Sequence, residues 1–178
     1  MTPVDLFLAI FPDSFAAGQI SDLANLLRAK HGLRGKPLAE TRFHLTLLWL
    51  GHYDCVPEDC PASVRAAAEE AAGPVPPFEV VFDRAGSFGK NRPFVLRRDG
   101  GNVELRRFQK ELAIALKNHG VRCDPSGFEP HITLLYDDRV VREQKVEPVN
   151  WVVNKFALVC SFVGQTKYRR LGEWNLRG

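Results

Sequence analysis

Two short motifs of the same form carry side chains that can do acid–base chemistry. Each holds a histidine and a threonine two residues apart, His44 with Thr46 and His131 with Thr133. With an unperturbed pKa of about 6.5, one imidazole can take a proton from an attacking hydroxyl or water while the other gives a proton to the departing oxygen. Threonine hydroxyls can donate hydrogen bonds to the non-bridging oxygens of a phosphate. The four side chains therefore suit metal-free cleavage of a phosphodiester or a cyclic phosphate.

The spacing within each motif fits a β-strand. Side chains alternate between the two faces of a strand, so a histidine and a threonine two apart point the same way. The neighbouring positions are apolar in both motifs, Leu45 and Leu47 in the first and Ile132 and Leu134 in the second. We expect a strand at each motif, with its apolar side in a core and its polar side free for a substrate. A single motif of this kind is more often structural, so the pair carries more weight than either alone.

The surroundings of the two motifs repeat. An offset of 87 positions separates His44 from His131, and the same offset relates residues 44–49 to residues 131–136. It also relates the strand-like residues 7–9 to residues 94–96, and the helix around 23–27 to the helix around 110–114. Strand, helix and motif strand thus occur twice in the same order. We expect two similar lobes related by a pseudo-twofold axis, each bringing one motif strand to a common cleft.

The remaining pattern is a mixture of helices and strands without a linker. Apolar residues at helical spacing predict helices over 15–30 and 102–119, and an Ala- and Glu-rich run predicts one over 61–72. The segment Pro12-Asp13-Ser14 offers an N-cap to the first helix, and Gly32 and Gly35 close it. Alternating or apolar runs predict strands over 4–10, 42–50, 78–82, 93–98, 130–136, 151–163 and 167–176, with a loop or hairpin over 86–92 and a polar loop over 122–129. We expect residues 1–178 to form one domain with both helices and strands.

Composition describes an ordinary globular chain. It has 178 residues, 45% hydrophobic and 25% charged, with a net charge of +3 that is too small to indicate nucleic-acid binding by itself. Basic clusters at 97–98, 106–110 and 167–170 are interpreted as solvated surface. We expect no transmembrane helix, because no apolar run is long enough, and no secretory signal, because the first residues include an acid and a proline. The expected location is the cytoplasm.

The sequence gives less support to a metal site or to a serine or cysteine nucleophile. The four cysteines fit no zinc-binding spacing, and His52, Cys55 and Cys60 lack a fourth ligand and a tight pattern. Neither histidine motif has a carboxylate or a second histidine at ligand spacing, and no nucleophile-elbow motif is present. His31, His52 and His119 are interpreted as surface or helix-capping residues. We expect no metal and no cofactor.

On these motifs the chain resembles the two-histidine (2H) phosphoesterases, specifically the bacterial RNA 2′,3′-cyclic phosphodiesterases, historically called 2′-5′ RNA ligases. The resemblance covers residues 6–10, 43–47, 50–51 and 128–135. It extends to a closing hairpin, where the matching residues are Ser161, Phe162, Thr166, Tyr168, Leu171 and Trp174. It implies a bilobal α+β fold with antiparallel sheets around a central cleft. It also implies hydrolysis of a 2′,3′-cyclic phosphate to a 2′-phosphomonoester, and reversible formation of 2′-5′ linkages.

The resemblance also implies roles for single residues. His44 would be the proton donor to the departing 3′ oxygen, and His131 the proton acceptor that activates water. Phe7 is a candidate substrate-binding residue. Two positions depart from the family pattern: Arg42 replaces a usual asparagine, and Tyr136 replaces a frequent arginine. Tyr136 can still stack on a nucleobase, and Arg42 can restore a positive charge near the phosphate.

The substrate is therefore expected to be RNA or a nucleotide with a 2′,3′-cyclic phosphate, and the protein a monomer without an obligate protein partner. Two alternatives stay open. One is a cyclic phosphodiesterase acting on a small nucleotide or an ADP-ribose derivative. The other is an RNA-binding module without useful turnover, against which the intact histidines and threonines of both motifs speak.

Overall fold

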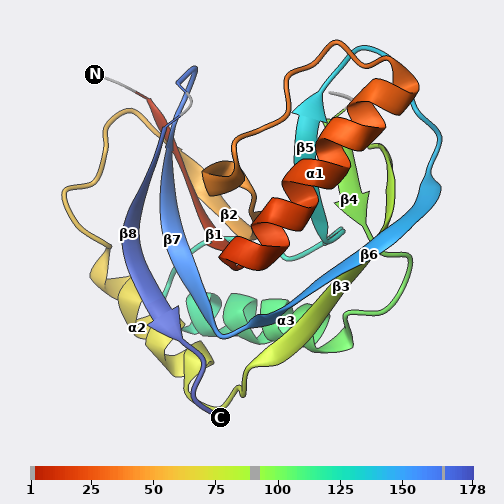
Figure 1. Ribbon diagram of the computed structural model, residues 1–178. Coiled ribbons are helices and arrows are strands. Elements are labelled where there is room, and N and C mark those ends of the chain that lie inside the picture. Colours follow the sequence, from red (N-terminus) through yellow and green to blue (C-terminus); the bar gives the residue numbers. More distant parts are fainter. Residues whose placement is uncertain (1–2, 89–92, 166) are drawn as a thin grey trace.

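The fold comes from a computed structural model, which describes residues 3–88, 93–165 and 167–178 (Figure 1). It has two antiparallel four-stranded sheets. Sheet A has the strand order β2-β1-β7-β8 and sheet B the order β5-β4-β3-β6. The strands are β1 (Val4–Ile10), β2 (Leu45–Tyr53), β3 (Phe78–Ser87), β4 (Pro93–Arg97), β5 (His131–Tyr136), β6 (Gln144–Val153), β7 (Lys155–Phe162) and β8 (Tyr168–Asn175). This confirms the α+β class and the two-lobed arrangement.

Three helices cover one face of the sheets. They are α1 (Ser14–His31), α2 (Ala62–Ala72) and α3 (Val103–Asn118). Helix α1 begins where the Asp13 carboxylate accepts the backbone N–H of Ala16 at 2.8 Å, and it ends at Gly32 with φ 60°, as predicted from the sequence. It lies across sheet B, in contact with β5 and β6 (Figure 1). Helix α1, which follows the first strand of sheet A, therefore packs against sheet B.

Helix α3 packs against both lobes. The ring of Phe108 packs against Phe78 of β3, in sheet B, with ring centroids 5.9 Å apart. It also packs against Phe156 of β7, in sheet A, at 5.1 Å. One large hydrophobic core therefore includes residues of both sheets and all three helices. We call the opposite face of each sheet, which carries the histidine–threonine motif, the motif face.

The internal repeat is present with one correction. In sheet A, Ala9 pairs with Thr46 and Leu8 with Leu48, so a β-bulge leaves out Leu47. In sheet B, Val95 pairs with Thr133 and the next pair leaves out Leu134. The two bulged residues, Leu47 and Leu134, are 87 positions apart, as the sequence repeat predicts. The partners of the two threonines, Ala9 and Val95, are only 86 positions apart. Mapping residues 7–9 onto 94–96 was therefore wrong by one position, because spacing in the sequence does not reveal strand register.

Several predicted boundaries also differ. The strand predicted over 42–50 starts only at Leu45, after a 3-10 turn at Glu40–Arg42, and it continues to Tyr53. Strand β3 runs to Ser87, so the predicted loop over 86–92 begins too early, and its residues 89–92 lie outside the described part of the chain. The predicted helices agree with the structure within two residues at either end.

The largest error concerns the strand predicted over 151–163. It is two strands, β6 and β7, which break at Asn154 and belong to different sheets. The first part of β6, residues 144–150, was missed. It is mostly polar and contains Pro148, a pattern that a strand tolerates at the edge of a sheet, where β6 lies. Among the described residues, no helix is long and apolar enough to span a membrane.

Candidate active site

The two motif histidines are held in the same way. His44 Nδ1 lies 2.8 Å from the backbone carbonyl oxygen of Arg42, and His131 Nδ1 lies 2.7 Å from that of Glu129. A carbonyl can only accept, so Nδ1 carries the proton in both rings and donates it to the chain two residues earlier. The other ring nitrogen, Nε2, is then left to exchange protons with a substrate. Neither hydrogen bond was predicted, because the sequence does not show which carbonyl each ring reaches.

The threonines occupy equivalent places in the two sheets. Thr46 and Thr133 are both half-buried, each between two buried apolar residues. After the threonine, two consecutive residues are buried at the bulge, so the strict alternation expected from the sequence is interrupted once in each strand. The strands β2 and β5 contact each other. The structure thereby brings the two motifs together from opposite lobes.

His44 lies in an aromatic setting that lowers its pKa. The Phe7 ring stacks on the imidazole at a centroid distance of 5.2 Å, and the Tyr168 ring meets it edge-on at 5.3 Å. Burial is the main cause that lowers the pKa of His44, because an imidazolium is poorly solvated there. The charges of Arg42 and of His131 lower it further, against the hydrogen bond to the Arg42 carbonyl. The influence of His131 means that the two imidazoles lie within electrostatic reach of each other.

His131 has a different neighbour. The ring of Phe88 lies 4.9 Å from its imidazole, and the guanidinium of Arg97 lies 5.6 Å from the centre of the same Phe88 ring. Its hydrogen bond to the chain is exposed to solvent, whereas that of His44 is partly buried. The two halves of the site are thus alike in backbone geometry and unlike in solvation, which provides a physical basis for giving the two histidines different roles.

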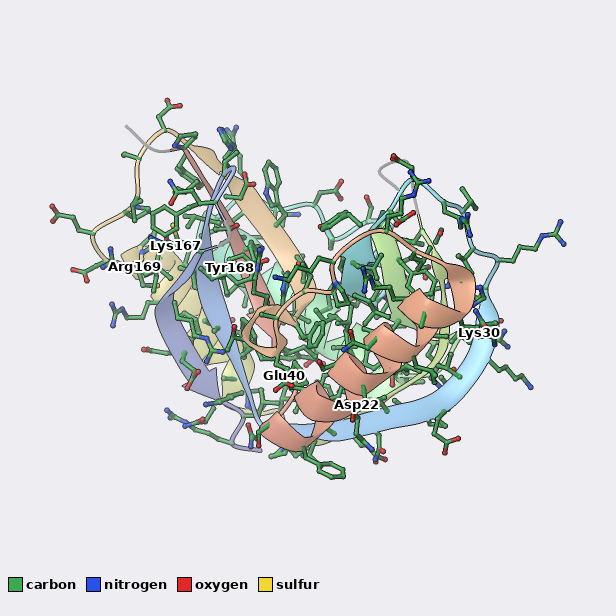
Figure 2. All side chains as sticks on the ribbon, turned by 45° about the horizontal axis from the view of Figure 1, so that its top comes forward. Asp22, Lys30, Glu40, Lys167, Tyr168 and Arg169 are labelled. Carbon is green, nitrogen blue, oxygen red and sulfur yellow. The ribbon has the colours of Figure 1, made fainter. Side chains whose placement is uncertain are left out.

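Arg42 turns toward sheet A. Its Nη2 donates to the hydroxyl oxygen of Tyr168 at 3.1 Å, and its guanidinium lies 4.7 Å from the centre of the same ring. Its Nε is buried and has no hydrogen-bond partner among the described residues. Figure 2 shows Tyr168 on the inner side of β8, with Arg169 outside. Arg42 therefore holds Tyr168 against His44.

The other two predicted binding residues lie in different surroundings. Phe7 is only 7% exposed and packs on His44, so its direct contact in this structure is with the catalytic candidate. Tyr136 is 59% exposed at the end of β5 and lines a polar pocket of about 510 Å³ with Arg34, Asp137 and other residues of two loops. A role of either side chain in substrate binding stays a prediction.

Three residues of the site were given no role from the sequence. Trp49 is 55% exposed and occupies the place in β2 that Tyr136 has in β5. The offset of 87 could have found it, because position 49 maps onto position 136. Tyr168 and Phe88 reach the histidines from β8 and from the end of β3, and no local pattern indicates such contacts.

Metal ligands and free thiols are not gathered at the site. Among the residues that the structure describes, no group of three histidine, cysteine or acidic side chains could hold a metal ion. His52 pairs with the Asp5 carboxylate at 2.9 Å. His119 caps the end of α3 and pairs with Glu70 at 2.8 Å. Both therefore have surface roles, as expected.

Comparison with known proteins places this arrangement in a family. The family model described as the 2′-5′ RNA ligase superfamily matches residues 11–161. The chain belongs to this superfamily. An RNA 2′,3′-cyclic phosphodiesterase of Escherichia coli (strain K12) is 30% identical over 150 residues, which cover 80% of each protein. The resemblance inferred from the motifs is confirmed, and the protein is an enzyme.

Solved structures of other proteins share the whole fold. The E. coli protein LigT, crystallised with 3′-AMP, superposes with a TM-score of 0.72 at 29% identity, and the match covers 99% of both chains. A protein of Thermus thermophilus superposes with a TM-score of 0.77 at 24% identity over 98% of both chains, which supports the fold alone. The two-lobed architecture is therefore that of the superfamily.

Proposed function

We propose that this protein hydrolyses RNA 2′,3′-cyclic phosphate ends to 2′-phosphomonoesters without a metal, using its paired histidines as general acid and base. The observation that carries the proposal is the matched hydrogen bond from each Nδ1 to the carbonyl two residues earlier. It leaves two Nε2 atoms, one from each lobe, as the groups that exchange protons. The membership of the superfamily and the cyclic phosphodiesterase among its relatives support the substrate class.

The steps follow from the protonation of the two rings. His131, neutral and protonated at Nδ1, accepts a proton from water at Nε2. The water oxygen forms a bond to phosphorus, and the bond from phosphorus to the 3′ oxygen breaks. His44, charged before the reaction, gives its Nε2 proton to that 3′ oxygen, so the product keeps its phosphate on the 2′ oxygen. Thr46 and Thr133 donate to the non-bridging oxygens, where negative charge builds up in the transition state.

The buried setting of His44 suits the role of acid once substrate is bound. Burial lowers its pKa, so the free enzyme holds this ring mainly neutral at neutral pH. The negative charge of a cyclic phosphate favours the imidazolium, because an opposite charge nearby stabilises the charged form. A buried imidazolium is also a stronger acid than an exposed one. The proton is therefore taken up with the substrate and released to the leaving oxygen.

The first test identifies the product. An oligoribonucleotide with a 2′,3′-cyclic phosphate end is incubated with the enzyme in excess EDTA, and the product is analysed as a 2′- or 3′-phosphate. We expect a 2′-phosphate end at an undiminished rate. A 3′-phosphate would contradict the departure of the 3′ oxygen, and inhibition by EDTA would contradict the absence of a metal.

A second test assigns acid and base. Replacing the 3′ oxygen of the substrate by sulfur gives a leaving group that departs without protonation. The His44→Ala variant should be nearly inactive on the oxygen substrate and largely restored on the sulfur one. The His131→Ala variant should be inactive on both, because water still needs a base. Restoration of His131→Ala instead would exchange the two roles.

The same site can form 2′-5′ linkages. If an RNA 5′-hydroxyl takes the place of water, His131 accepts its proton and the departing 3′ oxygen again takes one from His44. The product is then a 2′-5′ phosphodiester, and no bond energy beyond that of the cyclic phosphate is consumed. Ligation should therefore depend on both histidines in the same way as hydrolysis, and both variants should lose it in a gel assay with 5′-hydroxyl RNA.

A further inference from the structure

A row of basic side chains leads away from His131 across sheet B. His131 of β5 pairs with Arg97 of β4, Arg97 pairs with Arg84 of β3, and Arg84 pairs with Lys145 of β6. The row thus crosses all four strands of the sheet from the motif histidine to the far edge. Neighbouring strands lie about 4.8 Å apart, so the three cations extend over roughly 10 Å, starting one strand from His131.

Contacts place the two arginine side chains on the motif face. Arg97 Nε and Arg84 Nη1 both donate to the carboxylate of Glu143, the second at 3.4 Å. The Arg97 guanidinium also covers Phe88, whose ring contacts His131. Gln144, which precedes Lys145, bonds to His31 of α1 on the other face, so strand alternation directs Lys145 to the motif face. The residues that alternate with the row, including Ala85 and Leu96, are buried in the core beneath the sheet. They have no exposed surface.

The row remains accessible and positively charged. The side chains of Arg97 and Arg84 are 33% and 30% exposed, and Lys145 is exposed. Glu143 supplies one negative charge against three positive ones. A single carboxylate shared by two arginines aligns them but leaves a net charge of about +2 along the row. Such a surface attracts a ligand that carries several negative charges in sequence.

The other lobe provides an internal comparison. The two sheets can be superposed so that the pair Ala9 and Thr46 of sheet A matches the pair Val95 and Thr133 of sheet B. In sheet A, Phe11 then takes the place of Arg97, Lys155 that of Arg84, and Asn175 that of Lys145. Only Lys155 is basic, and its ammonium pairs with Glu173 at 2.9 Å. The pseudo-twofold relation therefore does not require the basic row. In sheet A, Arg170 covers the Phe11 ring and shares Glu173 with Lys155, so that lobe has two paired cations there. The continuous row of three cations at these positions is found in sheet B, on the side of His131.

We propose that the RNA strand 5′ to the cyclic phosphate runs across sheet B, with successive backbone phosphates contacting Arg97, Arg84 and Lys145. This inference rests on the proposed function and makes it more specific, because it names an RNA chain rather than a mononucleotide as the preferred substrate. A line of cations beside a groove is how proteins follow a single-stranded backbone without reading its sequence. The preference should therefore depend on length and on salt, and little on base sequence.

The test compares substrates of different length. We would measure kcat/KM for a 2′,3′-cyclic mononucleotide and for cyclic-ended oligoribonucleotides of two to five nucleotides, at several salt concentrations. The rate constant should rise with length and then level off once the row is filled. Each phosphate contact on a single strand contributes about 0.7 to the slope of log affinity against log salt. The longest substrate should thus be steeper than the mononucleotide by about 2.

Variants then connect the length effect to the row. Arg84→Gln with Lys145→Gln should lower kcat/KM for the longest substrate about three- to tenfold, as expected for two solvent-exposed charge contacts, and reduce the salt slope by about 1.4. Lys145→Gln alone serves if the double variant folds poorly, since this side chain is exposed. The matched control is Arg107→Gln with Lys110→Gln, which removes the same charge from exposed positions of α3. It should leave the length effect as in the wild type.

The outcomes separate the two proposals. If the mononucleotide is not hydrolysed and the oligonucleotides are not either, the proposed function fails. If all lengths are hydrolysed equally, the proposed hydrolysis is supported but the basic row does not bind the RNA backbone. The same conclusion follows if the control variant lowers kcat/KM for long substrates as much as the row variant does. A protein partner that protects Lys145 from chemical modification when RNA does not would also overturn it.

Discussion

Phe7 provides a sharp test of how the fold sets the acid–base properties of His44. Its ring stacks on the imidazole, is 7% exposed, and belongs to a small apolar cluster with Ala9 and Val159 on the motif face. In the Phe7→Ala variant water can reach the ring of His44. Because burial is the largest cause that lowers the pKa of His44, that pKa should rise toward the ordinary value of about 6.5.

The loss of packing can be judged from the same contacts. Replacing a buried phenylalanine by alanine costs about 3–5 kcal/mol, and we expect the lower end, because the cluster around Phe7 is small and opens toward solvent. A domain of ordinary stability, about 5–15 kcal/mol, stays folded after such a loss. Phe7→Leu keeps most of the packing at about 1 kcal/mol and serves as the milder variant.

The assay is an NMR titration of the imidazole signals of wild type and variants, with urea denaturation for stability. The His44 signal should titrate at higher pH in Phe7→Ala than in the wild type. His119, which ends α3 and pairs with Glu70, is the control within the same spectra. An unchanged or lower His44 pKa in a folded Phe7→Ala protein would refute the assignment of the shift to burial by this ring.

Three further outcomes are expected. Tyr168→Phe removes the acceptor of Arg42 Nη2 at 3.1 Å; it should cost about 1–2 kcal/mol in urea denaturation and lower kcat more than it raises KM. Gly35→Ala would put a Cβ 2.0 Å from the backbone oxygen of Tyr136, so the loop must move, which we expect to cost about 1–3 kcal/mol and to change the fluorescence or accessibility of that tyrosine. Finally, because the folded-state pKa of His44 lies below its unfolded value, its contribution to stability is present above pH 6.5 and is lost as the pH falls below it. The wild type should therefore lose more stability than His44→Gln between about pH 7.5 and pH 5.5, and an equal loss would contradict the shift.

The sequence by itself predicted the class of fold and the residues of the candidate site. A histidine and a threonine two apart share a face of any strand, so both histidine–threonine pairs could be singled out from local geometry alone. Helix ends were equally predictable, because Asp13 and Gly32 act through bonds within a few residues. The shared offset then indicated two lobes, since repeated order and spacing survive even where strand boundaries are misjudged. These features depend on neighbours in the chain.

The tertiary structure decided whatever depends on residues far apart in the chain. The bulges beside Leu47 and Leu134 correct the repeat by one position, and only the pairing of strands reveals them. Tyr168 reaches His44 from the last strand and makes its surroundings unlike those of His131, so two motifs that look equivalent in sequence differ in solvation.

The basic row of sheet B belongs to the same category. Arg84, Arg97 and Lys145 are spread over about sixty residues. Only Arg97 lies in a basic cluster of the sequence, which was interpreted as solvated surface, and Arg84 and Lys145 lie in none of these clusters. Strand register puts them side by side, one strand spacing apart, beginning next to His131. Register is set by the packing of both sheets against a common core, a sum over many weak and distant contacts. For this reason the motifs could be found from their spacing in the sequence, whereas the basic row, and with it the proposed path of the RNA, required the fold.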